Sequence, residues 1–530
     1  MLLYPWSCSL EISSILIPIA ILIVFRVFKA LQQRSKLPPG PLGLPVFGNL
    51  FQLPTSRPWL AFDNWAKQYG PIVYLNIAGQ NTIVLNSHKT AADLLERRAT
   101  IYSDRPDFIV LSIITGGMHW GFSRLDELWK RQRRGAHETL SSQTAKDYFT
   151  YQEIESVIML SQILADSEGF VDHFSRASTS LSLSIVYGWP PLLDSHHPTI
   201  TGIDRFNADL LEAAAPGSFW VEFEFFKWMR HLPRWMCTWK RNAEESFVRN
   251  TTMFERLASD VQKELDAGND TPSVVGKLLQ DTEKPGIIEI AWNAASIYSA
   301  GAETTAGQLA WFIQAMIFYP ETQRIAQDEI DRVVGPYRMP TFADYEHLPY
   351  IRATVKEILR WRGVSPIGLP HRLNQDDFYE GYFIPKDTVC FVNNWSLHRD
   401  KELYGDDAEH FNPGRFLDID GNVDSLIAGS KDEGHFSYGF GKRICVGRHV
   451  ANNSLFIHIA SLLWAFNIAA EVGRDGRLNF PDSLQCKEGL IVRPAPFRCK
   501  INARRMDIAA IVAQAKADRG IQPGRTERSI

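Results

Sequence analysis

Cysteine is scarce in this chain and follows no pairing pattern. The 530 residues include six cysteines, and no two of them form a CxxC pair. A disulfide framework needs regularly spaced cysteines in a short secreted chain. The spacing therefore argues against a disulfide-stapled scaffold and favours a reducing compartment. The six are Cys8, Cys237, Cys390, Cys445, Cys486 and Cys499.

The chain also lacks an excess of charge of either sign. Lys and Arg total 56 and Asp and Glu total 60, which gives a net charge of −4. Nucleic-acid-binding proteins usually carry a clear basic excess, so we expect no nucleic-acid partner. Length alone would allow two to four domains, but no internal repeat divides the chain. Hydrophobic residues make up 45% of it, enough for a large core.

Charge is absent between Ile12 and Phe25, and no Lys or Arg precedes this stretch. The apolar character continues to Phe28 and approaches the ~20 residues that a membrane span needs. A cleaved signal peptide is the alternative, but the basic residues follow the apolar run and no small-residue cleavage site stands out. We predict a membrane anchor with a basic flank over residues 1–36, and the positive-inside rule places the remaining chain in the cytosol. The flanking basic residues are Arg26, Lys29, Arg34 and Lys36.

Prolines follow the anchor in the run Leu37-Pro-Pro-Gly-Pro41. Clustered prolines form a stiff, non-helical connector, so we interpret residues 37–41 as a hinge. The main body then covers residues 42–506, and residues 507–530, which are polar or weakly helical and then basic, are expected to form a frayed tail. Patterning predicts helices over 58–69 and 88–97, short strands over 72–75 and 81–85, and mostly helices from residue 128 onward.

A long helix is predicted from Ile287 to Tyr319, because this stretch is apolar on nearly every face and Pro320 ends it. Its middle reads Ala300-Gly-Ala-Glu-Thr-Thr305. Glu303 and Thr304 are costly in so apolar a helix unless they are satisfied or used. A threonine can also bond to a carbonyl one turn earlier and loosen the helix, so a kink without chemistry is the alternative.

A glycine-rich turn near the C-terminus contains one cysteine, in the run Tyr438-Gly-Phe-Gly-Lys-Arg-Ile-Cys445-Val-Gly447. A thiolate is a strong soft ligand for iron, and glycines let backbone N–H groups approach its sulfur. A buried, inert cysteine is the alternative. Upstream, Glu357 and Arg360 are spaced to share one helix face, which by itself is more typical of a solvated ion pair.

These motifs, in this order, resemble those of the cytochrome P-450 family over residues 37–503. The resemblance implies a mainly α fold with small β-sheets, as a single haem-centred domain behind an N-terminal transmembrane helix. Cys445 is then the axial ligand of the haem iron, whose thiolate favours O–O cleavage. The family's motif usually begins with Phe, where this chain has Tyr438.

The resemblance also assigns roles around the oxygen site. Ala300 and Gly301 correspond to an oxygen-binding groove, Thr304 to the residue that hydrogen-bonds a water or the oxygen species, and Glu303 to a proton relay. Glu357 and Arg360 match the ExxR motif, which pairs with an arginine in a later loop. Arg415 fills that place in the segment 411–416, where Gly414 replaces a common glutamate.

Haem propionates buried with the cofactor need cations or strong donors. By the resemblance, these donors are Trp129 and Arg133 of a WxxxR helix, His371 and Arg443. Other cations would form a basic surface for an acidic electron-donor protein. They are Lys130, Arg131, Arg134, Lys442 and Arg448.

The implied activity is a monooxygenation that uses haem b, O2 and electrons from NADPH through NADPH-cytochrome P-450 reductase, with cytochrome b5 as a further donor. The implied location is the endoplasmic reticulum membrane. Apolar segments around 108–122, 205–240, 298–302, 364–368 and 488–490 suit a lipophilic small molecule. The stretch 361–372 is similar to fungal members that tailor secondary metabolites such as terpenoids or polyketides. A haem-thiolate isomerase or dehydratase, and a non-catalytic membrane-anchored lipid-binding protein, are the alternatives.

Overall fold

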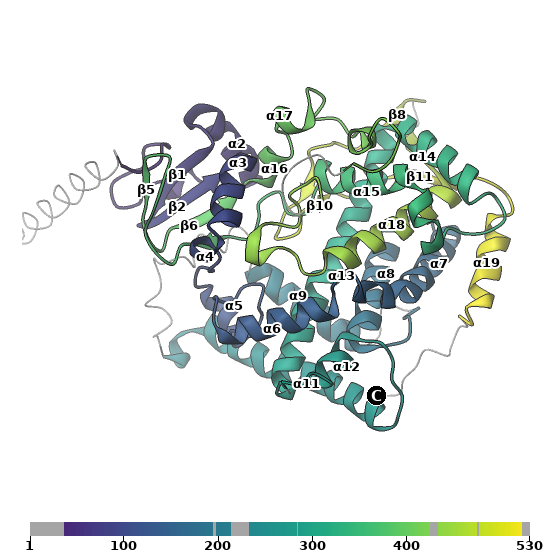
Figure 1. The fold of residues 1–530 in the computed structure, drawn as a ribbon, viewed down its shortest axis with the longest axis horizontal. Coiled ribbons are helices and arrows are strands. Elements are labelled where there is room, and N and C mark those ends of the chain that lie inside the picture. The colour runs from purple at the N-terminus through teal and green to yellow at the C-terminus, as the bar shows by residue number, and fades with distance from the viewer. Residues whose placement is uncertain are drawn as a thin grey trace, which may run out of the picture.

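The computed structural model describes residues 36–193, 198–213, 233–283, 285–424, 433–473 and 476–521, and these are mainly helical. Figure 1 shows the helices grouped around the long α13, with the larger β-sheet at one end of the molecule. The helices are α2 (Pro58–Tyr69), α3 (His88–Ala91), α4 (Ala99–Tyr102), α5 (Ile109–Ile114), α6 (Glu127–Thr139), α7 (Phe149–Ala165), α8 (Phe170–Tyr187), α9 (Pro198–Ala213), α11 (Thr238–Asp266), α12 (Val274–Leu279), α13 (Ile287–Phe318), α14 (Pro320–Val333), α15 (Pro349–Trp361), α16 (Asn394–Leu397), α17 (Lys401–Tyr404), α18 (Arg448–Ala465) and α19 (Ile508–Asp518).

The strands form small sheets, of which the largest has the order β1-β2-β6-β3. Strands β1 and β2 are joined through Ala78 and Gly79, both with positive φ, which suits a tight hairpin. Both strands extend the predicted ones. The strands are β1 (Ile72–Ile77), β2 (Gln80–Leu85), β3 (His371–Arg372), β4 (Asp377–Tyr379), β5 (Tyr382–Ile384), β6 (Val389–Val392), β7 (Phe466–Val472), β8 (Leu478–Asn479), β9 (Cys486–Lys487), β10 (Arg493–Pro494) and β11 (Cys499–Ala503).

Helix α13 forms the centre of the molecule, as its apolar sequence predicts. It packs against α8, α11 and α18, and its side chains contribute to two of the hydrophobic core clusters. The helix ends one residue earlier than predicted, because Tyr319 precedes Pro320 and takes φ −126° and ψ 64°. The motif around Thr304 therefore lies on a rigid, buried element.

The predicted helix over residues 88–97 is regular only at its start. Helix α3 ends at Ala91, and residues Ala92–Arg97 form the wider π-helical segment η2. The carbonyl of Leu95 in this segment lies against Gly441, at a distance that leaves no room for a Cβ. The irregular turn therefore sits directly beside the cysteine-containing loop.

The frayed tail predicted from residue 507 is wrong for its first part. Residues 508–518 form α19, which packs against α7 with Ile508 and Val512 fully buried. The two apolar side chains are four residues apart and share one helix face. The neighbouring residues are mostly alanines, which favour a helix.

The predicted anchor over residues 1–36 lies almost wholly outside the described residues. Across the residues that the structure does describe, no helix combines the length and apolarity that a membrane span requires. The hinge at residues 37–41 is non-helical, as its prolines predict, and it packs onto the sheet. Tyr74 donates its backbone N–H to the carbonyl of Pro39 at 2.8 Å, and Gly40 lies against the Tyr74 carbonyl.

Candidate active site

Glycine conformations shape the loop that carries Cys445. Gly439 and Gly441 have φ of 74° and 55°, a region that other residues rarely adopt. A Cβ on Gly441 would lie 2.1 Å from the Leu95 carbonyl oxygen, so no other residue fits there without a shift. The backbone N–H of Cys445 donates to the Tyr438 carbonyl at 2.8 Å, which closes the loop. The loop geometry therefore fixes where the sulfur points.

The Cys445 side chain lines a cavity of about 360 Å³ in the middle of the molecule. Helix α13 provides Ala300, Gly301 and Thr304 to the lining, and α8 provides Ser182. A Cβ on Gly301 would lie 2.9 Å from the Ser182 hydroxyl, so this glycine permits α8 and α13 to approach closely. Most of the remaining lining is apolar. The cavity thus joins a thiol, a polar patch on α13 and a hydrophobic enclosure.

The thiol of Cys445 is in a mixed electrostatic environment. Burial raises its pKa, while the Gly447 N–H and the positive charges of Arg133 and Arg448 oppose that increase. A buried thiol of this kind keeps its proton until a metal cation replaces it. The amide and the arginines then stabilise the thiolate that the metal requires.

A cluster of cations lies in one wall of the same cavity. Arg443 donates to the carbonyls of Ser103 at 2.8 Å, Ser123 at 2.9 Å and Trp120 at 3.0 Å. Its guanidinium stacks on Trp129, 4.5 Å from the ring centroid, and the Trp129 indole donates to the same Trp120 carbonyl at 3.1 Å. These contacts hold Arg443 and Trp129 as one rigid unit.

Three further basic side chains complete this cluster. Arg133 donates to the Ile444 carbonyl, His371 contacts the Tyr102 carbonyl through Nδ1 at 2.8 Å, and Arg105 donates to the Pro370 carbonyl at 2.6 Å. Burial lowers the pKa values of Arg105 and His371 well below their usual ranges, and the neighbouring charges of Arg443 on Arg105 and of Arg105 on His371 lower them further. Keeping these buried side chains charged therefore costs free energy unless an anion lies beside them.

These cations have carbonyl partners but no carboxylate partner. Within the described ranges, no ion pair includes Arg105, Arg133 or Arg443. A site with three unpaired guanidinium groups, one thiol and a large apolar enclosure suits a planar, lipophilic group that bears two carboxylates and a metal. The arrangement fits haem: Cys445 would ligate the iron, and the cations would hold the propionates.

The family model for cytochrome P-450 matches residues 38–500. The chain belongs to the cytochrome P-450 family. It is 48% identical over 514 residues to a cytochrome P-450 monooxygenase of Armillaria gallica, covering 96% of this chain and 98% of the relative. A cytochrome P-450 monooxygenase of Postia placenta is 45% identical over 517 residues, covering 96% and 97%, and the monooxygenase iboC of Amanita muscaria is 39% identical over 534 residues, covering 92% and 94%.

Membership makes this chain a fungal-type cytochrome P-450 monooxygenase, and the family uses haem b, O2 and NADPH-derived electrons from a redox partner. The family and the enzyme class predicted from the motifs are thus confirmed. The fold prediction is confirmed for the mainly helical body with small sheets.

The ExxR helix lies beside the cysteine loop and contains a closed ionic network. In α15, Arg360 donates to both oxygens of Glu357 at 2.6 and 2.8 Å, and Arg415 donates to the same carboxylate at 3.1 Å. Arg360 also donates to the carbonyls of His398, Ala408 and His410. The structure therefore brings Glu357, Arg360 and Arg415 together as the motif predicts.

Thr304 and Glu303 point to different surroundings. Thr304 lines the cavity, and its hydroxyl donates to the Ala300 carbonyl one turn earlier at 2.8 Å. Glu303 is absent from the lining, and its carboxylate forms an ion pair with Arg493 of β10. In this structure a relay role for Glu303 therefore requires the pair with Arg493 to open.

Most of the predicted basic surface is neutralised. Arg131 pairs with Glu289 at 3.0 Å, and Lys130 pairs with Glu127 at 2.6 Å. Arg134 is paired in the same way with Glu283. The sequence shows the cations and Glu127 as one run on α6, but not Glu283 and Glu289, which fold against them.

Two residues of the site were not predicted from the sequence. Arg105 belongs to the cation cluster, and the sequence around it, Ser103-Asp-Arg-Pro-Asp107, gives no local signal for that role. His119 lines the cavity and bonds to the Ser299 hydroxyl at 3.0 Å, and burial lowers its pKa to about 4. His119 lies within the segment 108–122 that was expected to face the substrate. Residues 214–232 of the expected segment 205–240 lie outside the described residues.

Proposed function

We propose that this protein is a membrane-anchored monooxygenase that oxidises a lipophilic small molecule in fungal secondary metabolism, with electrons from NADPH-cytochrome P-450 reductase. The observation that carries the proposal is the mostly apolar cavity between Cys445 and Thr304. A cavity of this kind buries an apolar ligand and excludes water from the reacting atoms.

The chain's own side chains would divide the work. Cys445 would ligate the haem iron, and Arg105, Arg133, Arg443, Trp129 and His371 would hold the propionates. Bound haem supplies oxygen activation, in which the electron density of a thiolate ligand favours O–O cleavage. Thr304 lines the cavity, and its hydroxyl, on turning from the Ala300 carbonyl, would hold a water there by hydrogen bond, so that protons reach the cavity through that water while the threonine keeps its own.

Product formation tests this proposal. Microsomes that contain the protein and a reductase are supplied with candidate terpenoids and polyketides, and products are analysed by mass spectrometry. Oxygenated products that require both NADPH and O2, and that gain one atom of labelled oxygen from O2, support the proposal. Turnover that proceeds without NADPH and O2 contradicts it in favour of an isomerase or dehydratase.

Anchoring is proposed from the apolar run within residues 1–36 and the basic residues after it. Full-length protein is expected in the membrane pellet after alkaline carbonate extraction, and a variant without residues 1–36 is expected in the supernatant with its haem spectrum unchanged. Equal partition of both proteins into the supernatant contradicts the anchor and the proposed endoplasmic reticulum location.

Reductase docking is proposed at the surface around Lys442, with cytochrome b5 as a second donor. Lys442 is exposed and adjoins Arg443 in the cysteine loop. Because the neighbouring cations on α6 are already paired, electrostatic steering is expected to be moderate. Lys442→Glu should slow the first electron transfer in stopped-flow measurements several-fold, whereas Lys67→Glu on α2 should not. Equal rates in all three proteins contradict this docking surface.

A further inference from the structure

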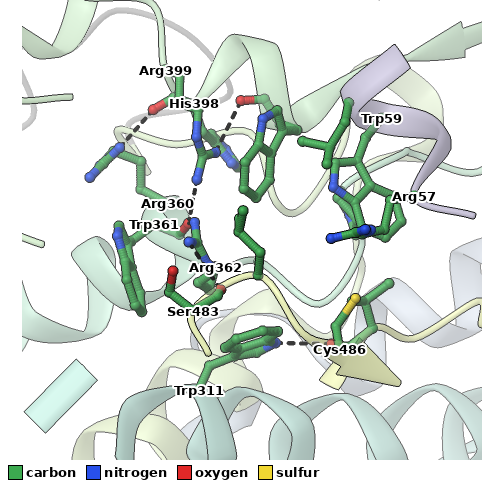
Figure 2. Close-up of a pocket in the computed structure, with 16 residues that line it drawn as sticks. Arg57, Trp59, Trp311, Arg360, Trp361, Arg362, His398, Arg399, Ser483 and Cys486 are labelled. Carbon is green, nitrogen blue, oxygen red and sulfur yellow. Dashed lines mark hydrogen bonds between the residues drawn. The ribbon is translucent and has the colours of Figure 1, made fainter. Parts of the chain in front are cut away.

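A second cavity, of about 30 Å³, lies where the end of α15 meets the start of α2 and the segment around β9. It shares no lining residue with the haem cavity. Figure 2 shows it surrounded by aromatic and cationic side chains from several elements. Two residue types dominate the lining, tryptophan and arginine: Trp59, Trp311, Trp361, Trp395, Arg57, Arg360, Arg362 and Arg399.

Two of these arginines are neutralised and two are not. Arg360 pairs with Glu357 at 2.6 Å, and Arg399 pairs with Glu409 at 2.9 Å. In the ranges that the structure describes, no ion pair includes Arg57 or Arg362. Among the described residues, the lining therefore carries two guanidinium groups with no carboxylate in direct contact, although Glu409 and Glu488 lie nearby.

Arg362 is surrounded by rings and has only weak hydrogen bonds. Its guanidinium carbon lies 4.4 Å from the Trp361 ring centroid and 4.8 Å from that of Trp395. Its hydrogen bonds in the described structure go to the carbonyls of Trp361 at 3.2 Å and Ser483 at 3.4 Å. Stacked rings occupy the faces of a guanidinium and leave its N–H edge for an acceptor in the plane, which a carboxylate matches best.

Arg362 remains a cation despite its surroundings. Burial lowers its pKa to about 10, which still lies well above neutral pH. The indole rings around it exclude water and so strengthen its attraction for an anion. On the other side of the cavity, the nearby carboxylate of Glu488 accepts the backbone N–H of Arg57 at 2.7 Å, so this acid contacts the Arg57 backbone.

A third cavity, of about 40 Å³, connects the positions of the other two. It is almost entirely apolar, with Phe62, Ile367 and Phe391 in its lining. It shares three lining residues with the arginine-lined cavity, namely Trp59, Pro366 and Val492, and three with the haem cavity, namely Gly368, Leu369 and Leu490. The three cavities therefore lie in series, from Arg362 to the haem cavity.

We propose that the arginine-lined cavity binds the carboxylate of a lipophilic acid, with the carboxylate on Arg362 and Arg57 and the apolar chain in the adjoining cavity. A water needs about 10–15 Å³ of such space, so 30 Å³ holds a carboxylate and excludes a ring. The chain then extends toward the haem cavity. The proposal identifies lipophilic carboxylic acids as the substrate class of the enzyme. The assignment of a substrate class rests on the proposed function.

Binding of octanoate and octanol to the holoenzyme tests the proposal. The two probes have the same chain, and only octanoate has a charge. The low-to-high-spin absorbance change reports on the haem cavity, and a tryptophan fluorescence change that is lost in Trp395→Phe is assigned to the arginine-lined cavity. Octanoate is expected to bind at least about tenfold more tightly than octanol by fluorescence. Arg362→Gln is expected to remove this preference while the ferrous–carbon monoxide spectrum stays unchanged.

Matched variants keep the result decisive. Arg324→Gln, on exposed α14, removes a cation elsewhere and should leave the preference intact. If Arg362→Gln does not fold, Arg57→Gln is used, and it should reduce the preference several-fold. Equal affinity for both probes, or a preference that survives in the folded variant, overturns the proposal. Lack of NADPH-dependent turnover with every substrate would instead count against the proposed function, because the binding preference does not depend on turnover.

Discussion

Removal of the Glu357 carboxylate should destabilise the haem domain more than any change at an exposed ion pair. Glu357 accepts two hydrogen bonds from Arg360, one from Arg415 and one from the backbone N–H of Asn412. The side chains of Glu357 and Arg360 are both 0% exposed. Glu357→Ala therefore leaves the buried guanidinium of Arg360 without an anion, whereas Arg415 keeps its pair with Asp407 at 3.1 Å.

The magnitude follows from this burial. Breaking a buried ion pair by removing one partner costs about 3–5 kcal/mol, because the remaining charge is not solvated. Whole domains are stable by only about 5–15 kcal/mol, so this loss removes a large share of the total. We expect Glu357→Ala to fail to retain haem. Glu357→Gln preserves the volume and one acceptor oxygen, so its loss should fall toward the lower end of the range.

Two measurements check this prediction. The ratio of haem to protein is determined after purification, and urea unfolding is followed by circular dichroism. Glu321→Ala is the control, because Glu321 forms an exposed pair with Arg324 and its removal should leave the stability close to that of wild type. A Glu357→Ala protein that is soluble, fully loaded with haem and within about 1 kcal/mol of wild type would refute the structural role.

Three further substitutions test the site. Thr304→Ala removes the hydroxyl that bonds to Ala300, and it should raise the ratio of peroxide released to NADPH consumed. Burial lowers the pKa of His119 to about 4, so below about pH 6.5 the unfolded chain binds a proton that the folded chain rejects, and stability falls with pH. Between about pH 7 and pH 5, the unfolding free energy of wild type measured in urea should fall by up to about 2 kcal/mol more than that of His119→Gln, which lacks the titrating ring. Tyr438→Phe removes the hydroxyl that donates to Asn452 at 2.6 Å, and it should lower the unfolding free energy by about 1 kcal/mol with haem retained.

Each of these three has an outcome that contradicts it. Unchanged coupling in Thr304→Ala would leave that residue as a helix-loosening feature only. Identical pH dependence of His119→Gln and wild type would show that this ring is not buried and neutral. Loss of haem from Tyr438→Phe would mean that its hydroxyl does more than fix Asn452.

The sequence predicted those parts of the site that are encoded locally. Cys445 and its glycines are contiguous, Glu357 and Arg360 share one turn of helix, and Thr304 lies in a helix whose apolar faces are evident from the residues. Each of these features depends on local backbone geometry or on the helical period, so a short segment of sequence is enough to predict it. The same holds for α13, whose start was predicted correctly and whose end differs by one residue.

The remaining features depend on contacts between distant segments. Arg105 joins the cation cluster only because the fold brings it against Pro370, and Glu303 meets Arg493 through the packing of β10 on α13. Two of the acids that neutralise α6, Glu283 and Glu289, come from the stretch 281–289, which no local pattern relates to that helix. Tertiary packing decides all of these pairs, so sequence periodicity could not reveal them.

The most direct test of the account is the axial bond to the haem iron. Reduced holoenzyme under carbon monoxide should show the absorbance band that is characteristic of thiolate-ligated haem, and Cys445→Ser should lose that band while Cys499→Ser retains it. A band that persists in Cys445→Ser, or a wild-type spectrum typical of imidazole ligation, would contradict the central claim.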